Sequence, residues 1–96
     1  MKMLMLVYSG PNSQRVTSLL DRHGATGYTE FRAGRGMGTT GRREGTRAWP
    51  GESSLFLSVV PVAQADSLVA TLGAEARELP LGEHLHVAVL PLEAFI

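Results

Sequence analysis

The sequence of 96 residues contains no cysteine, and its only lysine is Lys2. The absence of cysteine excludes a disulfide-stabilised fold, a thiol nucleophile and a zinc site with cysteine ligands. The longest apolar stretch, residues 3–8, is too short to span a membrane, which takes about 20 residues. The turn-forming residues Gly10 and Pro11 follow it directly and do not resemble a signal-peptide cleavage site. We therefore predict a cytoplasmic protein of one domain, residues 1–96, with no direct membrane insertion.

An excess of charge of either sign is also absent, because nine Lys and Arg residues balance nine Asp and Glu residues. A neutral chain does not favour nucleic acid as a partner, so none is expected. The acidic residues are scattered along the sequence and form no pair suited to acid–base catalysis. We therefore expect that the protein is not an enzyme.

The spacing of apolar residues predicts two strand–helix–strand halves. A continuous apolar run predicts the first strand, and apolar residues at i, i+3, i+4 and i+7 predict each helix. The predicted elements are a strand at 3–8, a helix between Ser13 and Gly24, strands at 28–33 and 55–60, a helix from Ala65 to Gly73 or onward to Glu78, and a strand at 84–90. This β-α-β-β-α-β order predicts an α+β, ferredoxin-like fold, in which a four-stranded antiparallel sheet carries two helices on one face.

The other face of such a sheet has no helices to cover it. Depending on the register of the strands, we expect this face to carry Tyr28, Phe56, Val60, Ala88 and Leu90. An apolar sheet face of this kind is usually buried between subunits, so we predict a trimer or a dimer.

The long connection between the second and third strands, residues 34–53, holds most of the glycine and much of the positive charge. Its G-x-G-x-x-G run at residues 36–41 is not followed by an amphipathic helix, which a dinucleotide-binding fold requires. Glycine backbone N–H groups and arginine side chains nevertheless bind phosphate and carboxylate groups well. We interpret Gly34, Arg35 and Gly36 as an anion cradle; the alternative is a solvated surface loop without a ligand.

Trp49, the only tryptophan, lies two residues beyond Arg47 in the same connection. Tryptophan and arginine are frequent anchors of protein interfaces, so this region is a candidate contact surface for a partner. The alternative is that the indole folds back onto the base of the loop.

Two histidines, His84 and His86, lie at i and i+2 of the last predicted strand and should therefore share one face. Imidazoles at this spacing suit a transition metal, above all if a symmetry-related subunit supplies a third ligand. The alternative is a hydrogen-bonded or surface pair with no metal.

Residues 29–36 read T-E-F-R-A-G-R-G and lead into the long connection. This run, the small size and the β-α-β-β-α-β order resemble those of PII-like signalling proteins, whose extended T-loop starts at this position. The resemblance implies a homotrimer that binds a small anionic effector, such as an adenine nucleotide, in clefts between subunits. It also implies a metal-linked alternative, because some PII-like and CutA-like proteins are associated with metals, here through His84 and His86.

The resemblance further assigns roles within the long connection. It implies that the effector contacts the loop base, and that a T-loop-like segment at about 37–53 reaches a membrane transporter or a metabolic enzyme. The implied ligand-binding residues are Gly34, Arg35, Gly36, Met37 and Gly38, and the implied partner-binding residues are Arg42, Arg43, Arg47 and Trp49. The stretch 78–83 lacks the glycines and lysine that nitrogen-sensing members carry there, so nitrogen sensing is not expected.

Overall fold

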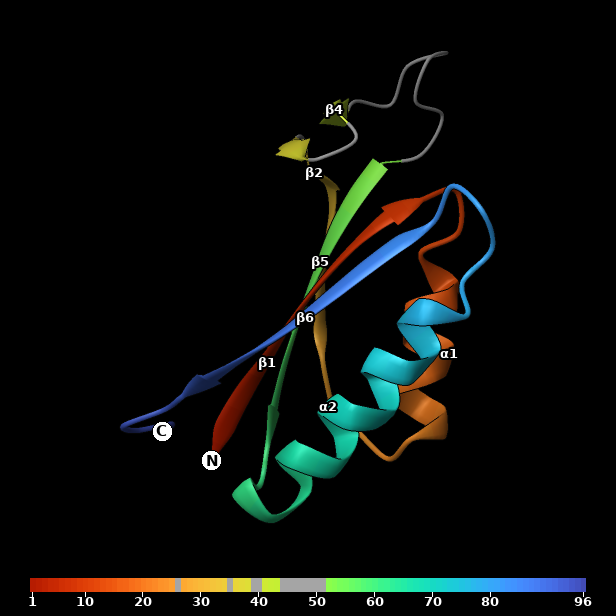
Figure 1. The fold of residues 1–96 in the computed structure, drawn as a ribbon. Coiled ribbons are helices and arrows are strands. Elements are labelled where there is room, and N and C mark those ends of the chain that lie inside the picture. Colours follow the sequence, from red (N-terminus) through yellow and green to blue (C-terminus); the bar gives the residue numbers. More distant parts are fainter. Residues whose placement is uncertain (26, 35, 39–40, 44–51) are drawn as a thin grey trace.

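The computed structural model describes residues 1–25, 27–34, 36–38, 41–43 and 52–96. Four long strands, two short strands and two helices make up these ranges (Figure 1). In chain order they are β1 (Lys2–Gly10), α1 (Gln14–Arg22), β2 (Thr29–Gly34), β3 (Gly36–Gly38), β4 (Gly41–Arg43), β5 (Glu52–Val60), α2 (Val62–Arg77) and β6 (His84–Pro91).

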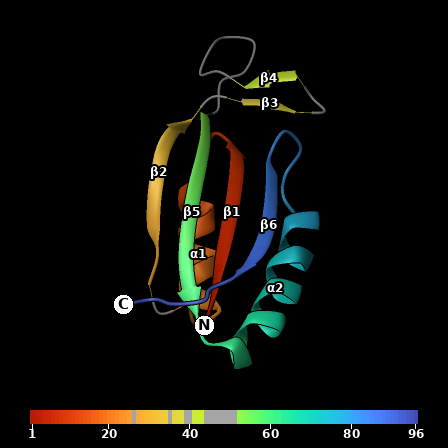
Figure 2. The same ribbon diagram turned by 90° about the vertical axis from the view of Figure 1, so that its left-hand side faces the viewer.

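The four long strands form an antiparallel sheet in the order β2-β5-β1-β6, with β1 and β5 at its centre. Both helices pack on the same face of this sheet, and the opposite face carries no helix (Figures 1 and 2). The predicted ferredoxin-like α+β fold is therefore confirmed. The two short strands β3 and β4 pair with each other beyond the end of the main sheet (Figure 2).

The core lies between the sheet and the helices. On β1, Leu4, Leu6 and Tyr8 point toward the helices and are fully buried, because every second residue of a strand faces the same side. The amphipathic stripes of both helices cover them. The core residues are Leu4, Leu6, Tyr8, Val16, Leu19, Leu20, Phe56, Val60, Ala65, Leu68, Leu72 and Leu85.

Most of the helix ends lie where the sequence predicts them. His23 is the C-cap of α1, and Gly24 after it has a φ of 83°, a left-handed conformation that glycine adopts without strain. Ser13 is the N-cap, although its side chain makes no capping hydrogen bond. The second helix does not end at Gly73 but continues to Arg77.

Neither helix of the described ranges is long and apolar enough to cross a membrane.

The helix-free face of the sheet, called the free face below, differs in part from the prediction. Ala88 and Leu90 lie on it as expected, since they pair with Met5 and Met3 of β1. Phe56 and Val60 were wrongly assigned, because both are fully buried in the core beneath the helices. The residues of β1 and β5 that do lie on the free face are Met3, Met5, Val7, Ser9, Ser53, Leu55, Leu57 and Val59.

Tyr28, also expected on the free face, lies at the edge of the sheet just before β2. Its ring makes an edge-to-face contact with Phe56, with the centroids 6.4 Å apart. It also borders a hollow of about 440 Å³ on the free face, together with Phe31 and Phe95. The C-terminal segment that carries Phe95 crosses in front of the sheet from β6 toward β2 (Figure 2).

The connection between β2 and β5 is not a featureless loop, as the prediction had it. It contains the two-stranded hairpin, in which Gly36 pairs with Arg43 and Met37 with Arg42. Backbone hydrogen bonds alone can build such a pair, so the sequence needs no apolar alternation there, and this is why the pattern gave no signal.

Candidate functional site

One end of the sheet brings four distant parts of the chain together. Here β1 and β2 end, and β5 and β6 begin (Figure 2). The register places Gly34 of β2 opposite Ser53 of β5, Ser53 opposite Ser9 of β1, and Ser9 opposite His84 of β6. These four residues form a row across the sheet, which we call the polar row. The turn between α2 and β6 closes the same end from the helix side.

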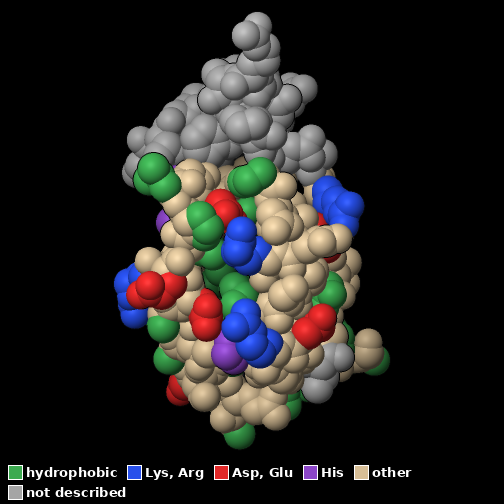
Figure 3. All heavy atoms as spheres, turned by 90° about the vertical axis from the view of Figure 1, so that its right-hand side faces the viewer, with side chains coloured by type: hydrophobic (Ala, Val, Ile, Leu, Met, Phe, Trp, Pro, Cys, Tyr) green, Lys and Arg blue, Asp and Glu red, His purple; other side chains and the backbone are tan. Residues whose placement is uncertain are grey.

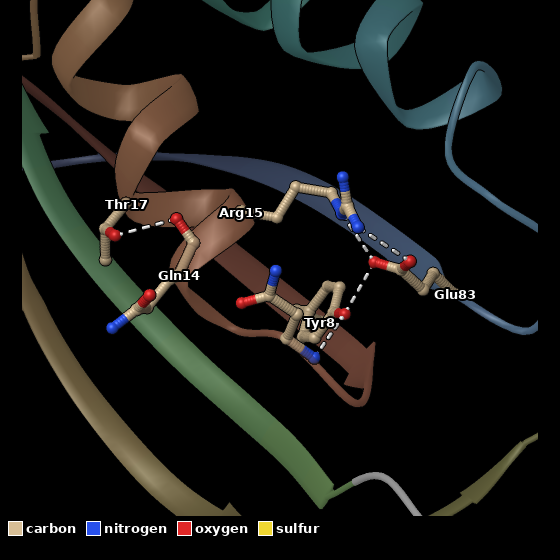
Figure 4. Close-up of polar contacts among 6 residues, drawn as sticks. Tyr8, Gln14, Arg15, Thr17 and Glu83 are labelled. Atoms are coloured by element: carbon tan, nitrogen blue, oxygen red, sulfur yellow. Dashed lines mark hydrogen bonds and ion pairs between the residues drawn. The ribbon is translucent and has the colours of Figure 1, made fainter.

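A charged cluster on the helix side fixes this turn in place (Figure 4). The Tyr8 hydroxyl donates a hydrogen bond of 2.7 Å to Glu83 Oε1, and Arg15 donates from Nε to Oε1 at 2.7 Å and from Nη2 to Oε2 at 3.2 Å. The Asn12 backbone N–H in turn donates to the Tyr8 hydroxyl oxygen at 3.0 Å. The cluster, called the Glu83 clamp below, joins β1, α1 and the turn before β6.

The Glu83 carboxylate is almost fully buried, with 5% of its side chain exposed, whereas 38% of the Arg15 side chain is exposed. Burial raises the pKa of Glu83, but hydrogen bonds from Tyr8 and Arg15 outweigh burial and hold this pKa below its ordinary value of 4.5. The hydrogen bond to Glu83 also raises the pKa of Arg15. The clamp is therefore a charged pair with a neutral phenol attached.

Burial, assisted by the hydrogen bond to Glu83, raises the pKa of Tyr8 to about 12 from an ordinary value of 10.0. The folded protein thus keeps the phenol protonated at a pH where the unfolded chain ionises. We predict that this contribution to stability is complete below pH 10 and is lost as the pH rises toward 12. Absorbance of tyrosinate in a Tyr28→Phe variant, where Tyr8 is the only tyrosine, measures this pKa directly. A midpoint near 10 in the folded protein would contradict the prediction.

Gly10 has no side chain, and this leaves room for the Glu83 clamp. A Cβ at this position would lie 2.5 Å from the Tyr8 hydroxyl oxygen and 2.9 Å from Glu83 Cγ, and the φ of 152° is one that other residues rarely adopt. A side chain there would push the phenol away from the carboxylate. The glycine that ends β1 is therefore required by close packing as well as by backbone conformation.

The polar row on the free face contains two serine hydroxyls without a hydrogen bond to any described residue. Ser9 Oγ and Ser53 Oγ are both buried, and neither has a hydrogen-bond partner among the residues that the structure describes. A buried hydroxyl without a partner costs about 1 to 3 kcal/mol. Native proteins satisfy most such groups, so the two serines stand out among the described side chains.

Comparison with known proteins identifies the family. The chain matches the family described as nitrogen regulatory protein P-II over residues 1–90. It belongs to the P-II family. A search of the curated proteins finds no match to this chain. The predicted resemblance to PII-like proteins is therefore confirmed, and the chain is a PII-like regulatory protein.

Several solved structures of CPII, a nitrogen regulatory PII-like protein from Thiomonas intermedia K12, share the fold. One, bound to ADP, AMP and bicarbonate, is 23% identical, with a TM-score of 0.69 over 93% of this chain and 84% of that chain. Another, bound to ADP, AMP and acetate, is 19% identical, with a TM-score of 0.64 over 97% of this chain and 88% of that chain. The apo form is 19% identical, with a TM-score of 0.61 over 93% of this chain and 87% of that chain.

The described residues account for part of the predicted PII-like ligand site. Gly34 is the last residue of β2 and a member of the polar row. Gly36, Met37 and Gly38 form β3, directly beyond this end of the sheet. Arg35 lies outside the described residues. The assignment of these residues to effector binding therefore stays a prediction.

The predicted partner-binding residues fall on the hairpin and beyond it. Arg42 and Arg43 belong to β4, where only the backbone is described. Arg47 and Trp49 lie outside the described residues. Their role in contacting a partner likewise stays a prediction.

The two histidines share the free face, as strand alternation predicts. His84 pairs with Ser9 and His86 with Val7, both of which point to this side. The described ranges contain no group of three or more His, Asp or Glu side chains arranged to hold a metal ion. The metal-binding alternative therefore rests on these two side chains alone.

The sequence did not single out Tyr8, Arg15 and Glu83 as a group. Glu83 had been counted among the scattered acidic residues, yet it is the most deeply buried of the charged side chains that the structure describes. The only local feature that sets Glu83 apart in the sequence is its position between a Pro-Leu-Gly turn and a strand. An exposed glutamate would be equally common at such a position.

Proposed function

We propose that the chain forms a homotrimer that binds an adenine nucleotide and a small oxoanion in clefts between its subunits. The match to the P-II family over residues 1–90 carries this proposal. CPII structures of the same fold, solved with ADP, AMP and either bicarbonate or acetate, indicate the class of effector. In this proposal the protein regulates and does not catalyse, and it acts in the cytoplasm.

The two faces of the molecule support the trimer. The helix-bearing face carries Lys, Arg, Asp and Glu side chains spread over its surface (Figure 3). The free face is apolar over most of its area: Met5, Leu57 and Val59 are half-buried there, and Phe31 is 53% exposed. An exposed apolar surface of this kind is typical of an interface, and homo-oligomers bury such surfaces between symmetry-related subunits.

The ligand site in this proposal lies at the end of the sheet where the polar row and β3 meet. Gly34, Arg35, Gly36, Met37 and Gly38 supply backbone N–H groups and one guanidinium, which suit phosphate. The Glu83 clamp supports this end by holding the turn before β6. The segment with Arg42, Arg43, Arg47 and Trp49 is the proposed contact with a membrane transporter or a metabolic enzyme, because its arginines and indole match the composition of interface anchors.

Calorimetry tests the function. We expect at least one of AMP, ADP, ATP and cyclic AMP to bind, with as many sites as chains, and we expect bicarbonate to change the affinity. Sedimentation of the same sample should give a trimer. A trimer that binds none of these nucleotides would contradict the nucleotide part of the proposal, and a monomer would contradict its intersubunit site.

A further inference from the structure

The polar row contains the two buried hydroxyls of the free face that make no hydrogen bond to any residue that the structure describes. Ser9 is only 1% exposed, and its Oγ and that of Ser53 are buried without a hydrogen bond to any described residue. The register puts the two serines directly opposite each other on the central strands. Both point away from the core, since Tyr8 and Ser54, the neighbours on either strand, point into it.

The position of these serines in the fold connects them with the proposed ligand site. Gly34 continues the row on the β2 side, next to Ser53, and adds no side chain. His84 continues it on the β6 side, next to Ser9, and adds an imidazole. The buried Glu83 carboxylate does not belong to this surface, because it points to Tyr8 on the opposite side of the sheet. The four residues of the row therefore offer two hydroxyl donors and an imidazole, and none of the four is acidic.

The two serine hydroxyls of the row determine which class of ligand can bind there. Directly opposite residues of antiparallel strands have Cβ atoms about 4.5–5.5 Å apart, so two serine hydroxyls can donate to two oxygens of one small molecule. Neutral hydroxyls are weak ligands for the metal ions that proteins usually bind, but they are good donors to an anion, where hydrogen bonds are strongest. A planar anion with two adjacent oxygens satisfies both hydroxyls at once.

We propose that Ser9 and Ser53 bind a small trigonal oxoanion, of the carboxylate or bicarbonate class, at the end of the free face. The proposal rests on the proposed function and assigns its oxoanion to the two serine hydroxyls, next to the phosphate-binding glycines. His84 borders the bound anion and limits its size. The oxoanion and the nucleotide then lie at the same end of the sheet on different groups, so we expect binding of the first to change the affinity for the second.

The test uses the full-length protein and the variants Ser9→Ala and Ser53→Ala, with Ser54→Ala as the matched control. Ser54 is buried like Ser9 and is adjacent to Ser53, but it faces the helices. Sodium bicarbonate and sodium acetate are titrated against the nucleotide-loaded protein, with sodium chloride as the ionic-strength control. We expect each of the two variants to bind the oxoanion about tenfold more weakly or worse, and Ser54→Ala to bind it like the wild type. Nucleotide affinity measured without oxoanion should change by less than about twofold in all three.

The outcomes separate this proposal from the function on which it rests. Wild-type protein that binds nucleotide and bicarbonate, together with unchanged bicarbonate affinity in Ser9→Ala and Ser53→Ala, would overturn the serine site and leave the function standing. The hydroxyls would then hold ordered water only. Wild-type protein that binds neither ligand would overturn both. If Ser9→Ala does not fold, the less buried Ser53→Ala decides the question alone.

Discussion

Replacing Glu83 by glutamine is expected to lower the free energy of unfolding by about 2 to 3 kcal/mol. The substitution keeps the size of the side chain but removes the charge that accepts two bonds from Arg15 and one from Tyr8. The amide nitrogen would also face a donor, so at least one buried group loses its partner. Urea denaturation followed by circular dichroism measures the change.

The pH dependence of this effect gives a second readout. Because the folded protein lowers the pKa of Glu83, the carboxylate stabilises the fold above its ordinary pKa of 4.5, and this contribution is lost as the pH falls through the lower, folded value. The difference between wild type and Glu83→Gln should therefore be full at neutral pH and shrink in acid. A difference that stays constant with pH would show that the charge is not its cause.

Glu78→Gln is the matched control, because Glu78 caps α2, lies in the same connection and is exposed. Removal of an exposed charge of this kind changes stability by less than about 0.5 kcal/mol. Equal losses for Glu78→Gln and Glu83→Gln would contradict the clamp. Its expected importance is structural: it fixes the turn that leads into His84, at the end of the sheet where the effector site is proposed.

The fold could be predicted from the sequence because local signals agree with one another. The spacing of apolar residues predicted both helices and all four long strands. Their β-α-β-β-α-β order is that of one common architecture, the ferredoxin-like fold. The assignment of strand faces failed for Phe56 and Val60 of β5, because alternation separates the two faces of a strand but does not tell which face the helices cover. In the structure Ser58 is buried on the helix side and donates a hydrogen bond of 2.6 Å to the Gly27 carbonyl oxygen.

The site could be predicted only where it depends on composition. Glycine and arginine density drew attention to residues 34–38, and the structure puts Gly34 at the end of the sheet that we propose as the site. The clamp and the serine pair depend on contacts over long separations, such as the 75 residues between Tyr8 and Glu83. The register of β1 and β5 places Ser9 opposite Ser53. A single sequence carries no information on partners that far apart.

Replacing Leu57 by glutamate is expected to convert the proposed trimer into monomers. Leu57 lies in the middle of the free face, opposite Met5 on one side and Thr29 on the other. A trimer built on this face would bury three unpaired carboxylates, each at a cost of several kcal/mol. The monomer should keep its fold, because Leu57 is only half-buried in the single chain and the core beneath the helices is unchanged.

Sedimentation and circular dichroism test this expectation together, with Val62→Glu as the control. Val62 begins α2 at a position that is 56% exposed and is not on the sheet, so a glutamate there should leave the trimer intact. Nucleotide binding should be lost in Leu57→Glu alone, because a cleft between subunits does not exist in a monomer. A Leu57→Glu protein that remains trimeric would show that another surface holds the subunits together, whereas a folded monomer that still binds nucleotide would place the effector site within a single chain.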